Sequence, residues 1–457
     1  MADRLSILNP EPEEQAGPSL VHHLVSSRTT NGFPAIEYLS PDNSIEQLSY
    51  LQLHDRADAL ASILQSIKAN ATTSESSPFI VPILIPQCPH LYISELAVLE
   101  AGAAFCPISL DVPEERLRFI LRDIDAQVLL TTSELKGGLP YLENTLIVAV
   151  DDLSVERQVA RPPIIVEPSK PAYVMYTSGS TGQPKGVILS HRAATQALLA
   201  HDRHIPHFSR FLQFANPTFD VSVFEIFFPL FRGRTIVCGD RRRLLDDLPG
   251  FITNMNVDAA ELTPSVASSL LQGRGSVPTL KLLLTIGEML KYDVVESFSE
   301  CDDDRSILYG MYGPTEAAIH CTLQTAFLQD MPVGNIGIPL DTVSAFIIKP
   351  ATSDDPSQEA ISILPVGVEG ELAVGGHQLA DGYLNRAEQT DAAFVHHHEY
   401  GRLYRTGDRA RILSSGRLEC LGRISSGQVK LRGQVSTHSL FWLLRLRADD
   451  FLASRAR

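Results

Sequence analysis

The feature that most constrains the fold of this chain is an alternation of short β-branched runs with longer segments of helical spacing. Buried strands are predicted where the apolar runs are short and uninterrupted, at residues 79–85, 128–132, 146–150 and 282–286. Between them, residues 48–67 and 113–124 repeat Leu, Ala and Ile at helical intervals, and the second of these begins with proline. This alternation is typical of an α/β fold with mostly parallel sheets.

Length, charge and cysteine use narrow the class of protein. At 457 residues the chain exceeds what one hydrophobic core usually supports, so two or more domains or subdomains are expected. The formal net charge of -16 argues against nucleic acid as a partner, because a phosphate-tracking surface is basic. No apolar run approaches the roughly 18 residues of a membrane span, and the start of the chain lacks the apolar core of a signal peptide. The six scattered cysteines form no CxxC pair and favour reduced thiols, so we expect a cytoplasmic protein without a membrane partner.

A loop rich in hydroxyl groups and glycine, YTSGSTGQPKG at residues 176–186, follows a predicted strand at residues 172–176. Its small side chains allow backbone N–H groups to turn toward an anion, and Lys185 adds a positive charge. The loop is not a Walker A motif, because Lys185 is followed by Gly186 and Val187 rather than by Ser or Thr. A plain surface turn is the alternative, but so specific a run favours a phosphate-binding loop.

This loop resembles the phosphate-loop signature of the adenylate-forming superfamily, which includes acyl-CoA synthetases, luciferases and the adenylation domains of nonribosomal peptide synthetases. Further segments resemble other blocks of that family in the same order, namely LEAGAAFCPISLDVPEERLRFIL (99–121), FDVSVFEIF (219–227), MYGPTEAAI (311–319), GELAVGGHQLADGYLN (370–385) and YRTGDRARI (404–412). Together they extend over about residues 20–433. The FDVSVFEIF block and the GQVKLRG segment (427–433) are most similar to the peptide-synthetase branch.

The resemblance implies a large N-terminal α/β domain of stacked, mostly parallel sheets flanked by helices, with a small β-rich subdomain. We expect an N-terminal tail, the large adenylation (AMP-binding) domain, a hinge remnant and an off-family tail at residues 1–20, 21–421, 422–434 and 435–457. Family members continue into a C-terminal lid subdomain that brings a lysine to the reacting groups, whereas no lysine follows Lys430 in this chain. We therefore expect the lid to be essentially absent and the chain to be truncated at its C-terminus.

The resemblance also assigns residues to ATP phosphates. The loop positions that would hold the β- and γ-phosphates are Thr177, Ser178, Gly179, Ser180, Thr181 and Gly182. The residues expected to be catalytic are Lys185, which would bind the same phosphates, Thr315, which would donate to the α-phosphate, and Glu316. Glu316 is also the expected metal ligand, because Mg²⁺ prefers oxygen. ATP and Mg²⁺ are thus the expected cofactors.

Further positions are implied for the rest of the nucleotide. Tyr312 would stack on adenine, and Asp408 would accept hydrogen bonds from the ribose hydroxyls. Arg423 is similar to a second ribose and phosphate contact. For both Asp408 and Arg423 a surface ion pair is the alternative. Gly287 and Glu288 complete the expected nucleotide-binding set.

Asp220 points to the substrate class. In amino-acid-activating members the corresponding aspartate meets the α-ammonium group, and a partly buried cation needs such a partner. The alternative is that Asp220 caps a helix.

The resemblance also implies which residues line the side-chain pocket. They are mostly apolar and comprise Val221, Phe224, Glu261, Leu284, Ile286, Met311, Ile319 and His320. Glu261 suggests a substrate with a polar or basic side chain, unless it bonds His320 or the backbone and the substrate is aromatic or aliphatic.

The activity implied is ATP-dependent conversion of an amino acid to aminoacyl-AMP with release of pyrophosphate, in nonribosomal peptide or other secondary metabolism. One alternative is an acyl- or aryl-acid:CoA ligase of the same superfamily, which would not need Asp220. The other is a nucleotide-binding protein with weak or no catalysis. No carrier-type serine motif is found in the sequence, so phosphopantetheine is expected only on a partner, and the acyl group would pass to a carrier protein or to CoA in trans.

Overall fold

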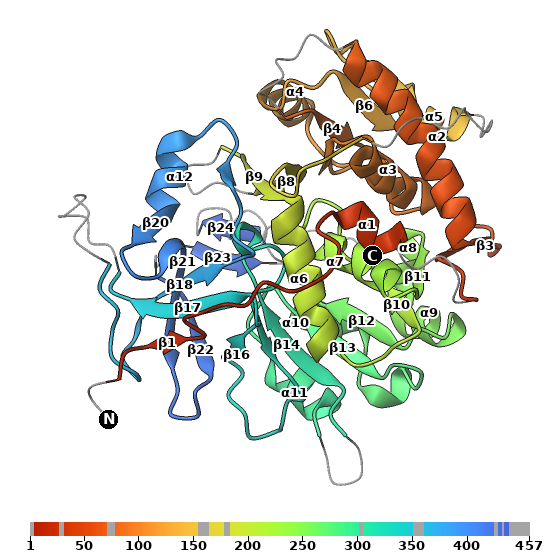
Figure 1. Ribbon diagram of the computed structural model, residues 1–457. Coiled ribbons are helices and arrows are strands. Elements are labelled where there is room, and N and C mark those ends of the chain that lie inside the picture. Colours follow the sequence, from red (N-terminus) through yellow and green to blue (C-terminus); the bar gives the residue numbers. More distant parts are fainter. Residues whose placement is uncertain are drawn as a thin grey trace, which may run out of the picture.

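The computed structural model describes residues 4–26, 32–70, 78–153, 164–177, 183–300, 305–350, 361–424, 428–431 and 434–437. Figure 1 shows two regions in which helices cover strands, and a third region, rich in strands, beside them. The α/β fold class predicted from the sequence is confirmed, including its small β-rich part. None of the described helices is long and apolar enough to cross a membrane.

One sheet of seven strands contains both strands that flank the expected phosphate loop. Its order is β19 (Gly382–Tyr383), β9 (Lys185–Ser190), β8 (Pro171–Thr177), β5 (Ala104–Pro107), β4 (Ile80–Ile83), β6 (Val128–Thr131) and β7 (Leu146–Ala149). The strands from β8 to β7 run parallel, whereas β9 is antiparallel to both β8 and β19. The loop between β8 and β9 therefore belongs to a hairpin at one side of a parallel sheet.

The larger sheet has 15 strands and two different halves. The mostly parallel half contains β14 (Leu308–Tyr312), β13 (Leu282–Thr285), β12 (Ala259–Leu262), β10 (Arg210–Leu212), β11 (Thr235–Gly239), β2 (Ile36–Leu39) and, antiparallel at the edge, β3 (Ile45–Leu48). The other half is antiparallel and contains β1 (Ile7–Leu8), β17 (Val343–Ile348), β18 (Gly370–Gly376), β20 (Phe394–His397), β21 (Gly401–Ile412), β22 (Leu418–Arg423), β16 (Asn335–Pro339) and β15 (Thr322–Gln324). A separate pair joins β23 (Gln428–Leu431) to β24 (Gln434–Thr437).

The described helices alternate with strands along the chain, and most of them come after a parallel strand. They are α1 (Val21–Ser26), α2 (Tyr50–Ala69), α3 (Pro89–Glu100), α4 (Glu114–Asp123), α5 (Ser133–Lys136), α6 (His191–His204), α7 (Val221–Phe231), α8 (Arg241–Asp246), α9 (Leu248–Asn254), α10 (Pro264–Leu270), α11 (Tyr292–Phe298) and α12 (Ala387–Ala393). Short 3₁₀ turns lie at Val150–Asp152, Arg274–Ser276 and Thr315–Ala317. The start of α2 is stabilised by a capping box in which Ser49 and Gln52 exchange hydrogen bonds. Nearly every residue of α7 is buried, because the helix is apolar on all sides and lies inside the core.

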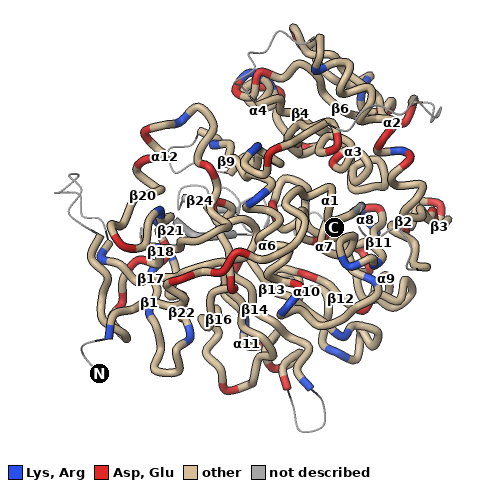
Figure 2. The backbone as a smooth tube through the Cα atoms, viewed as in Figure 1, with Lys and Arg blue, Asp and Glu red and all other residues tan. Residues whose placement is uncertain are grey.

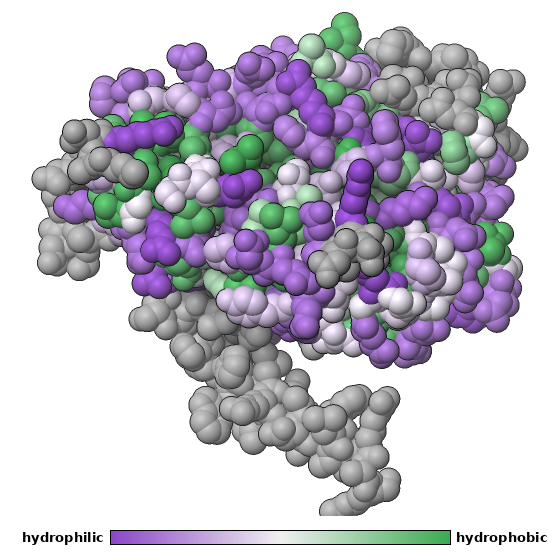
Figure 3. Space-filling view, turned by 90° about the horizontal axis from the view of Figure 1, so that it is seen from below, coloured by the Kyte–Doolittle hydropathy of each residue, from purple (hydrophilic) through white to green (hydrophobic). Residues whose placement is uncertain are grey.

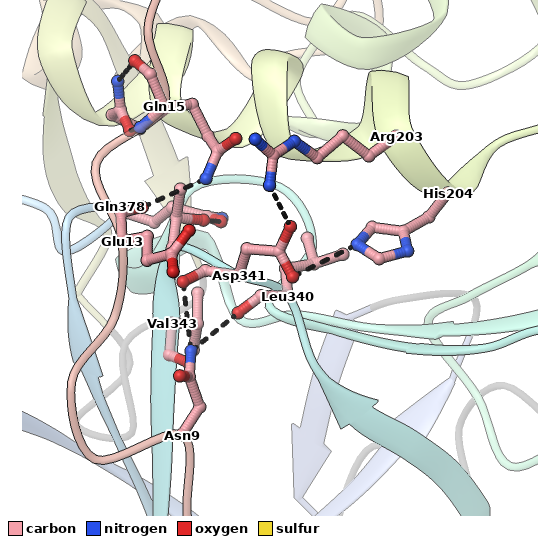
Figure 4. A network of polar contacts seen from close by, with 11 residues as sticks. Asn9, Glu13, Gln15, Arg203, His204, Leu340, Asp341, Val343 and Gln378 are labelled. Carbon is pink, nitrogen blue, oxygen red and sulfur yellow. Dashed lines mark hydrogen bonds and ion pairs between the residues drawn. The ribbon is translucent and has the colours of Figure 1, made fainter.

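The segment before α1 connects the antiparallel half of the large sheet to α6 (Figure 4). The Asn9 side chain donates to the carbonyls of Asp341 and Val343 at 3.0 and 2.8 Å. Gln15 and Gln196 exchange hydrogen bonds of 2.6 and 3.0 Å between side chain and backbone. The carboxylate of Asp341 also pairs with Arg203 at the basic end of α6. The residues before α1 thus pack against the domain.

Charge is mixed along the described chain (Figure 2), and hydropathy is mixed on one face of it (Figure 3). Figure 2 shows acidic and basic residues interspersed along the chain. Hydrophobic and hydrophilic residues are likewise interspersed on the face seen in Figure 3.

Candidate functional site

Parallel pairing brings the site positions to one edge of the large sheet. Leu284 on β13 pairs in register with Glu261 on β12 and with Tyr309 on β14. Because parallel strands end at the same edge, the segments that follow β13 and β14 lie next to each other. These segments are residues 286–288 and 313–320, which carry both substrate and nucleotide positions.

The residues expected to line the side-chain pocket lie together on one face of this sheet. One buried cluster contains Phe224, Leu284, Ile286, Met311 and Ile319, and Val221 packs against it. Leu283, one residue from Leu284, belongs to a cluster on the opposite face, as strand alternation requires. Glu261 shares the face of Leu284, its partner in register.

Asp220 lies buried at the start of α7 and faces the segment after β14. Its Oδ2 atom accepts the backbone N–H of Ile319 at 3.0 Å. The pKa of Asp220 is raised to about 7, mainly by burial and in smaller part by the nearby charge of Glu316, while hydrogen bonds from Ile319 and Thr315 oppose the shift. The alternative that Asp220 caps α7 is not supported, because its side chain makes no capping hydrogen bond. A desolvated carboxyl group of this kind is suited to a cationic partner.

The segment after β14 has a strained backbone. Ala318 and Ile319 have φ angles of 49° and 68°, and the left-handed region is unfavourable for a β-branched residue. Gly313 allows the segment to fold back on itself, because a Cβ atom there would lie 2.0 Å from the carbonyl oxygen of Ile319. A strained backbone of this kind is maintained only where contacts with the surrounding residues stabilise it.

Gln378 supplies much of that support. It lies buried between β18 and β19, and its amide nitrogen is 3.2, 3.2 and 2.7 Å from the carbonyl oxygens of Ala317, Ala318 and His320. Its own oxygen accepts the hydroxyl of Thr342, which orients the amide. Gln378 was not among the residues expected from the sequence, where the one signal was a lone amide inside the GGHQLADGY block.

The expected adenine and ribose residues contact one another. The hydroxyl of Tyr312 donates to Asp408 Oδ2 at 2.6 Å, and Arg423 Nη1 lies 3.1 Å from Asp408 Oδ1. Asp408 and Arg423 are paired across β21 and β22. Burial, followed by the charge of Asp408, raises the pKa of Tyr312 well above its ordinary value.

Lys185 and Glu316 meet at Tyr383, a residue that was not expected from the sequence. The hydroxyl of Tyr383 donates to Glu316 Oε1 at 2.7 Å, and Lys185 Nζ lies 4.9 Å from the centre of the Tyr383 ring. Thr177 and Lys185 are paired across β8 and β9, so the two ends of the phosphate loop are held together. The loop positions Ser178, Gly179, Ser180, Thr181 and Gly182 lie outside the described residues.

The remaining expected positions are also near the sheet edge. Gly287 has a left-handed φ of 88° just after β13. The carboxylate of Glu288 accepts the hydroxyl of Ser265, at the start of α10. Glu261 contacts His320, with 2.8 Å between Oε1 and Nε2, and both side chains are fully buried. This contact corresponds to the alternative in which Glu261 is paired with His320, although neither Glu261 oxygen nor His320 Nε2 forms a hydrogen bond of regular geometry.

Comparison with known proteins agrees with this arrangement. The family model described as AMP-binding enzyme matches residues 25–384. The chain belongs to the AMP-binding enzyme family. Membership confirms the resemblance that the sequence motifs indicated.

Curated relatives of this AMP-binding enzyme domain are fungal peptide synthetases. It is 55% identical over 433 residues to nonribosomal peptide synthetase SIDC of Beauveria bassiana, which covers 94% of this chain and 9% of that protein. It is 35% identical over 410 residues to a hydroxamate-type ferrichrome siderophore peptide synthetase of Schizosaccharomyces pombe. This match covers 86% of this chain and 8% of that protein. The chain thus spans less than a tenth of the length of these relatives.

Solved structures of a peptide synthetase, FmoA3, share the fold. One crystal structure superposes with a TM-score of 0.76 at 24% identity, covering 91% of this chain and 44% of that one. The form bound to AMPPNP gives a TM-score of 0.75 at 25% identity, with 90% and 43% covered. The form bound to α-methyl-L-serine-AMP gives 0.75 at 25% identity, with 90% and 46% covered. The predicted fold is confirmed by these superpositions, and the solved structures, like the curated relatives, are of peptide synthetases.

Proposed function

We propose that this chain activates an amino acid with ATP. A carboxylate oxygen of the amino acid attacks the α-phosphorus of ATP, the bond from that phosphorus to the bridging oxygen breaks, and pyrophosphate leaves with the bonding electrons. The products are aminoacyl-AMP and pyrophosphate. The observation that carries this proposal is the buried Asp220 carboxyl group, next to the strained segment that contains Thr315 and Glu316.

Asp220 would bind the α-ammonium group of the substrate. Asp220 accepts hydrogen bonds from the Ile319 N–H and from Thr315, and a buried carboxylate gains more from a cation than from such uncharged donors. An acyl or aryl acid has no ammonium group, so this carboxyl group disfavours the CoA-ligase alternative. Fixing the ammonium also places the substrate carboxylate for in-line attack.

Nucleotide binding is supported by the AMPPNP-bound neighbour. In this chain Tyr312, Asp408 and Arg423 would bind adenosine, while Lys185 and Thr315 would neutralise the phosphates. Each carboxylate oxygen has two lone pairs, so Asp408 can accept a ribose hydroxyl while keeping its present contacts.

The residues present fit Mg²⁺ held mainly by phosphates. The described residues contain no group of three or more His, Cys, Asp or Glu that would hold a metal ion. Glu316 offers one carboxylate, already oriented by Tyr383, and Mg²⁺ in nucleotide sites is usually bound by one or two carboxylates plus substrate phosphates. When bound, the ion would neutralise charge on the triphosphate. Tyr383 would keep the Glu316 carboxylate directed toward it.

The relatives suggest the biological setting. They are peptide synthetases, one of them named for a siderophore, so we place the reaction in cytoplasmic synthesis of a nonribosomal peptide of that class. The acyl group would pass to the phosphopantetheine arm of a carrier domain.

ATP–pyrophosphate exchange tests the function directly. With a panel of amino acids, we expect label from pyrophosphate to enter ATP only when ATP, Mg²⁺ and a suitable amino acid are present. Exchange supported by acyl or aryl acids but by no amino acid would favour the CoA-ligase alternative. ATP binding without exchange for any acid would instead favour a nucleotide-binding protein without catalysis.

The raised pKa of Asp220 predicts a pH dependence for substrate binding. The ionised carboxylate binds the ammonium group, so affinity falls as pH decreases through about 7 and is constant above it. Between pH 7 and pH 6 we expect the KM for the amino acid to rise about fivefold, from the change in the protonated fraction. The KM for ATP is the internal control, and an amino-acid KM that is flat from pH 6 to pH 8 would contradict the assignment.

A further inference from the structure

Three fully buried polar side chains form a connected series next to the residues expected to line the side-chain pocket. It begins at Glu261 on β12, whose Oε1 atom is 2.8 Å from His320 Nε2. His320 Nδ1 lies 3.0 Å from His201 Nε2, and His201 Nδ1 contacts the carbonyl oxygen of Ala197 within α6. None of the three side chains is exposed to solvent. This series of three polar side chains therefore connects β12, the segment after β14 and α6.

The carbonyl oxygen of Ala197, next to His201, determines which ring nitrogen of each histidine carries a proton. A carbonyl oxygen only accepts, so His201 must carry hydrogen on Nδ1, and its Nε2 then accepts from His320 Nδ1. His320 Nε2 and Glu261 Oε1 lie 2.8 Å apart without a hydrogen bond of regular geometry, and one proton is left for this pair of atoms. With this proton on either the nitrogen or the oxygen, the three side chains together have no net charge.

Burial favours the uncharged form of each histidine. Desolvation lowers the pKa of His320 to about 3, and desolvation followed by the charge of His320 lowers that of His201 well below its ordinary value. Desolvation likewise raises the pKa of Glu261 well above its ordinary value. The charged groups that also face this series are Glu225, on α7 near Glu261, and Arg232 with His204, near His201.

The series is in contact with the pocket wall. The ring of Phe224, an expected pocket residue, lies 5.0 Å from the His320 ring and 4.9 Å from the His201 ring, measured between centres. His320 directly follows Ile319, whose N–H binds Asp220. A change in the contacts among Glu261, His320 and His201 would therefore alter the place where the substrate side chain is expected to lie.

We propose that His320 and His201 neutralise Glu261, so that the pocket selects an amino acid with an uncharged side chain and rejects basic ones. His201 is then a positioning residue that acts through His320. A basic substrate would have to separate Glu261 from His320 and bring its own charge into a fully buried site, which is unfavourable. This inference rests on the proposed function and narrows the substrate class that the sequence left open.

Exchange assays with matched amino acids test the selectivity. Wild-type protein should give kcat/KM values about 100-fold higher for its best uncharged amino acid than for ornithine, lysine or arginine. His320→Leu leaves the Glu261 carboxyl group unpaired, so this ratio should fall by about tenfold or more. His201→Phe should lower it by a smaller factor, whereas Glu261→Gln, which cannot be a counter-ion, should not lower it. His207→Phe, at an exposed position after α6, is the matched control and should not change it.

NMR of protein labelled with ¹⁵N-histidine provides a readout that does not depend on activity. His201, assigned by the loss of its signals in His201→Phe, should be the Nδ1–H tautomer from pH 6 to pH 8. Preference of the wild type for a basic amino acid, or an Nε2–H tautomer of His201, would overturn the inference. Absence of exchange with every amino acid would contradict the proposed function instead, and the tautomer would then decide the inference on its own.

Discussion

Replacing Asp220 with asparagine is expected to lower kcat/KM for the amino acid by about 10²–10³-fold. Loss of a buried charged partner typically costs about 2–5 kcal/mol, and the asparagine amide would also direct a donor toward the substrate ammonium or the Ile319 N–H. The effect should appear mainly in the KM for the amino acid, because Asp220 contacts the ammonium group rather than the phosphates. ATP–pyrophosphate exchange at saturating ATP measures it.

Two controls separate this effect from damage to the fold. Asp55→Asn makes the same chemical change at an exposed position on α2 and should leave exchange unchanged. The KM for ATP in Asp220→Asn should stay within about threefold of the wild-type value, because the nucleotide residues are untouched. An Asp220→Asn protein with unaltered kcat/KM for the amino acid would remove the main support for an amino-acid substrate.

Replacing Gln378 with leucine is expected to lower the free energy of unfolding by about 3 kcal/mol. The change leaves buried carbonyl oxygens of Ala317, Ala318 and His320 without their donor, at about 1–3 kcal/mol for each unsatisfied group. The left-handed backbone of Ala318 and Ile319 would then relax. Because the same segment carries Thr315 and Glu316, we expect exchange activity of the folded protein to fall more than about tenfold.

Denaturant unfolding and exchange assays on the same preparation measure both effects. Gln65→Leu, at a half-buried position on α2, is the matched control and should change neither quantity appreciably. Wild-type stability together with wild-type exchange in Gln378→Leu would show that the strained segment does not depend on this amide.

Much of the fold follows from local patterns. The strands predicted at residues 128–132 and 282–286 correspond to β6 and β13, and the helices predicted at 48–67 and 113–124 correspond to α2 and α4, with ends shifted by one or two residues. These elements could be predicted because an apolar run or a helical repeat depends only on residues that are close together in the sequence. The motif blocks likewise indicated the family, which the comparisons confirm.

Only part of the candidate site could be predicted from the sequence. Motif positions such as Asp220, Tyr312 and Asp408 could be named from the sequence, and in the structure Tyr312 contacts Asp408 while Asp220 accepts a backbone N–H from the segment after β14. Tyr383 and Gln378 were missed, because their partners lie about 60 residues or more away in the chain. No local pattern distinguishes such residues from ordinary members of a strand connection.

The amino-acid sequence alone therefore sufficed for the α/β class, the family and the identity of the motif residues, because each depends on residue types at short spacing. Only the tertiary structure showed that Glu261 is paired with His320, that His201 continues this contact, and that Gln378 holds a strained segment. The physical reason is that the state of a buried polar group depends on which donors and acceptors surround it in space. Those neighbours come from β12, α6 and the segments after β14 and β18, which are far apart in the chain.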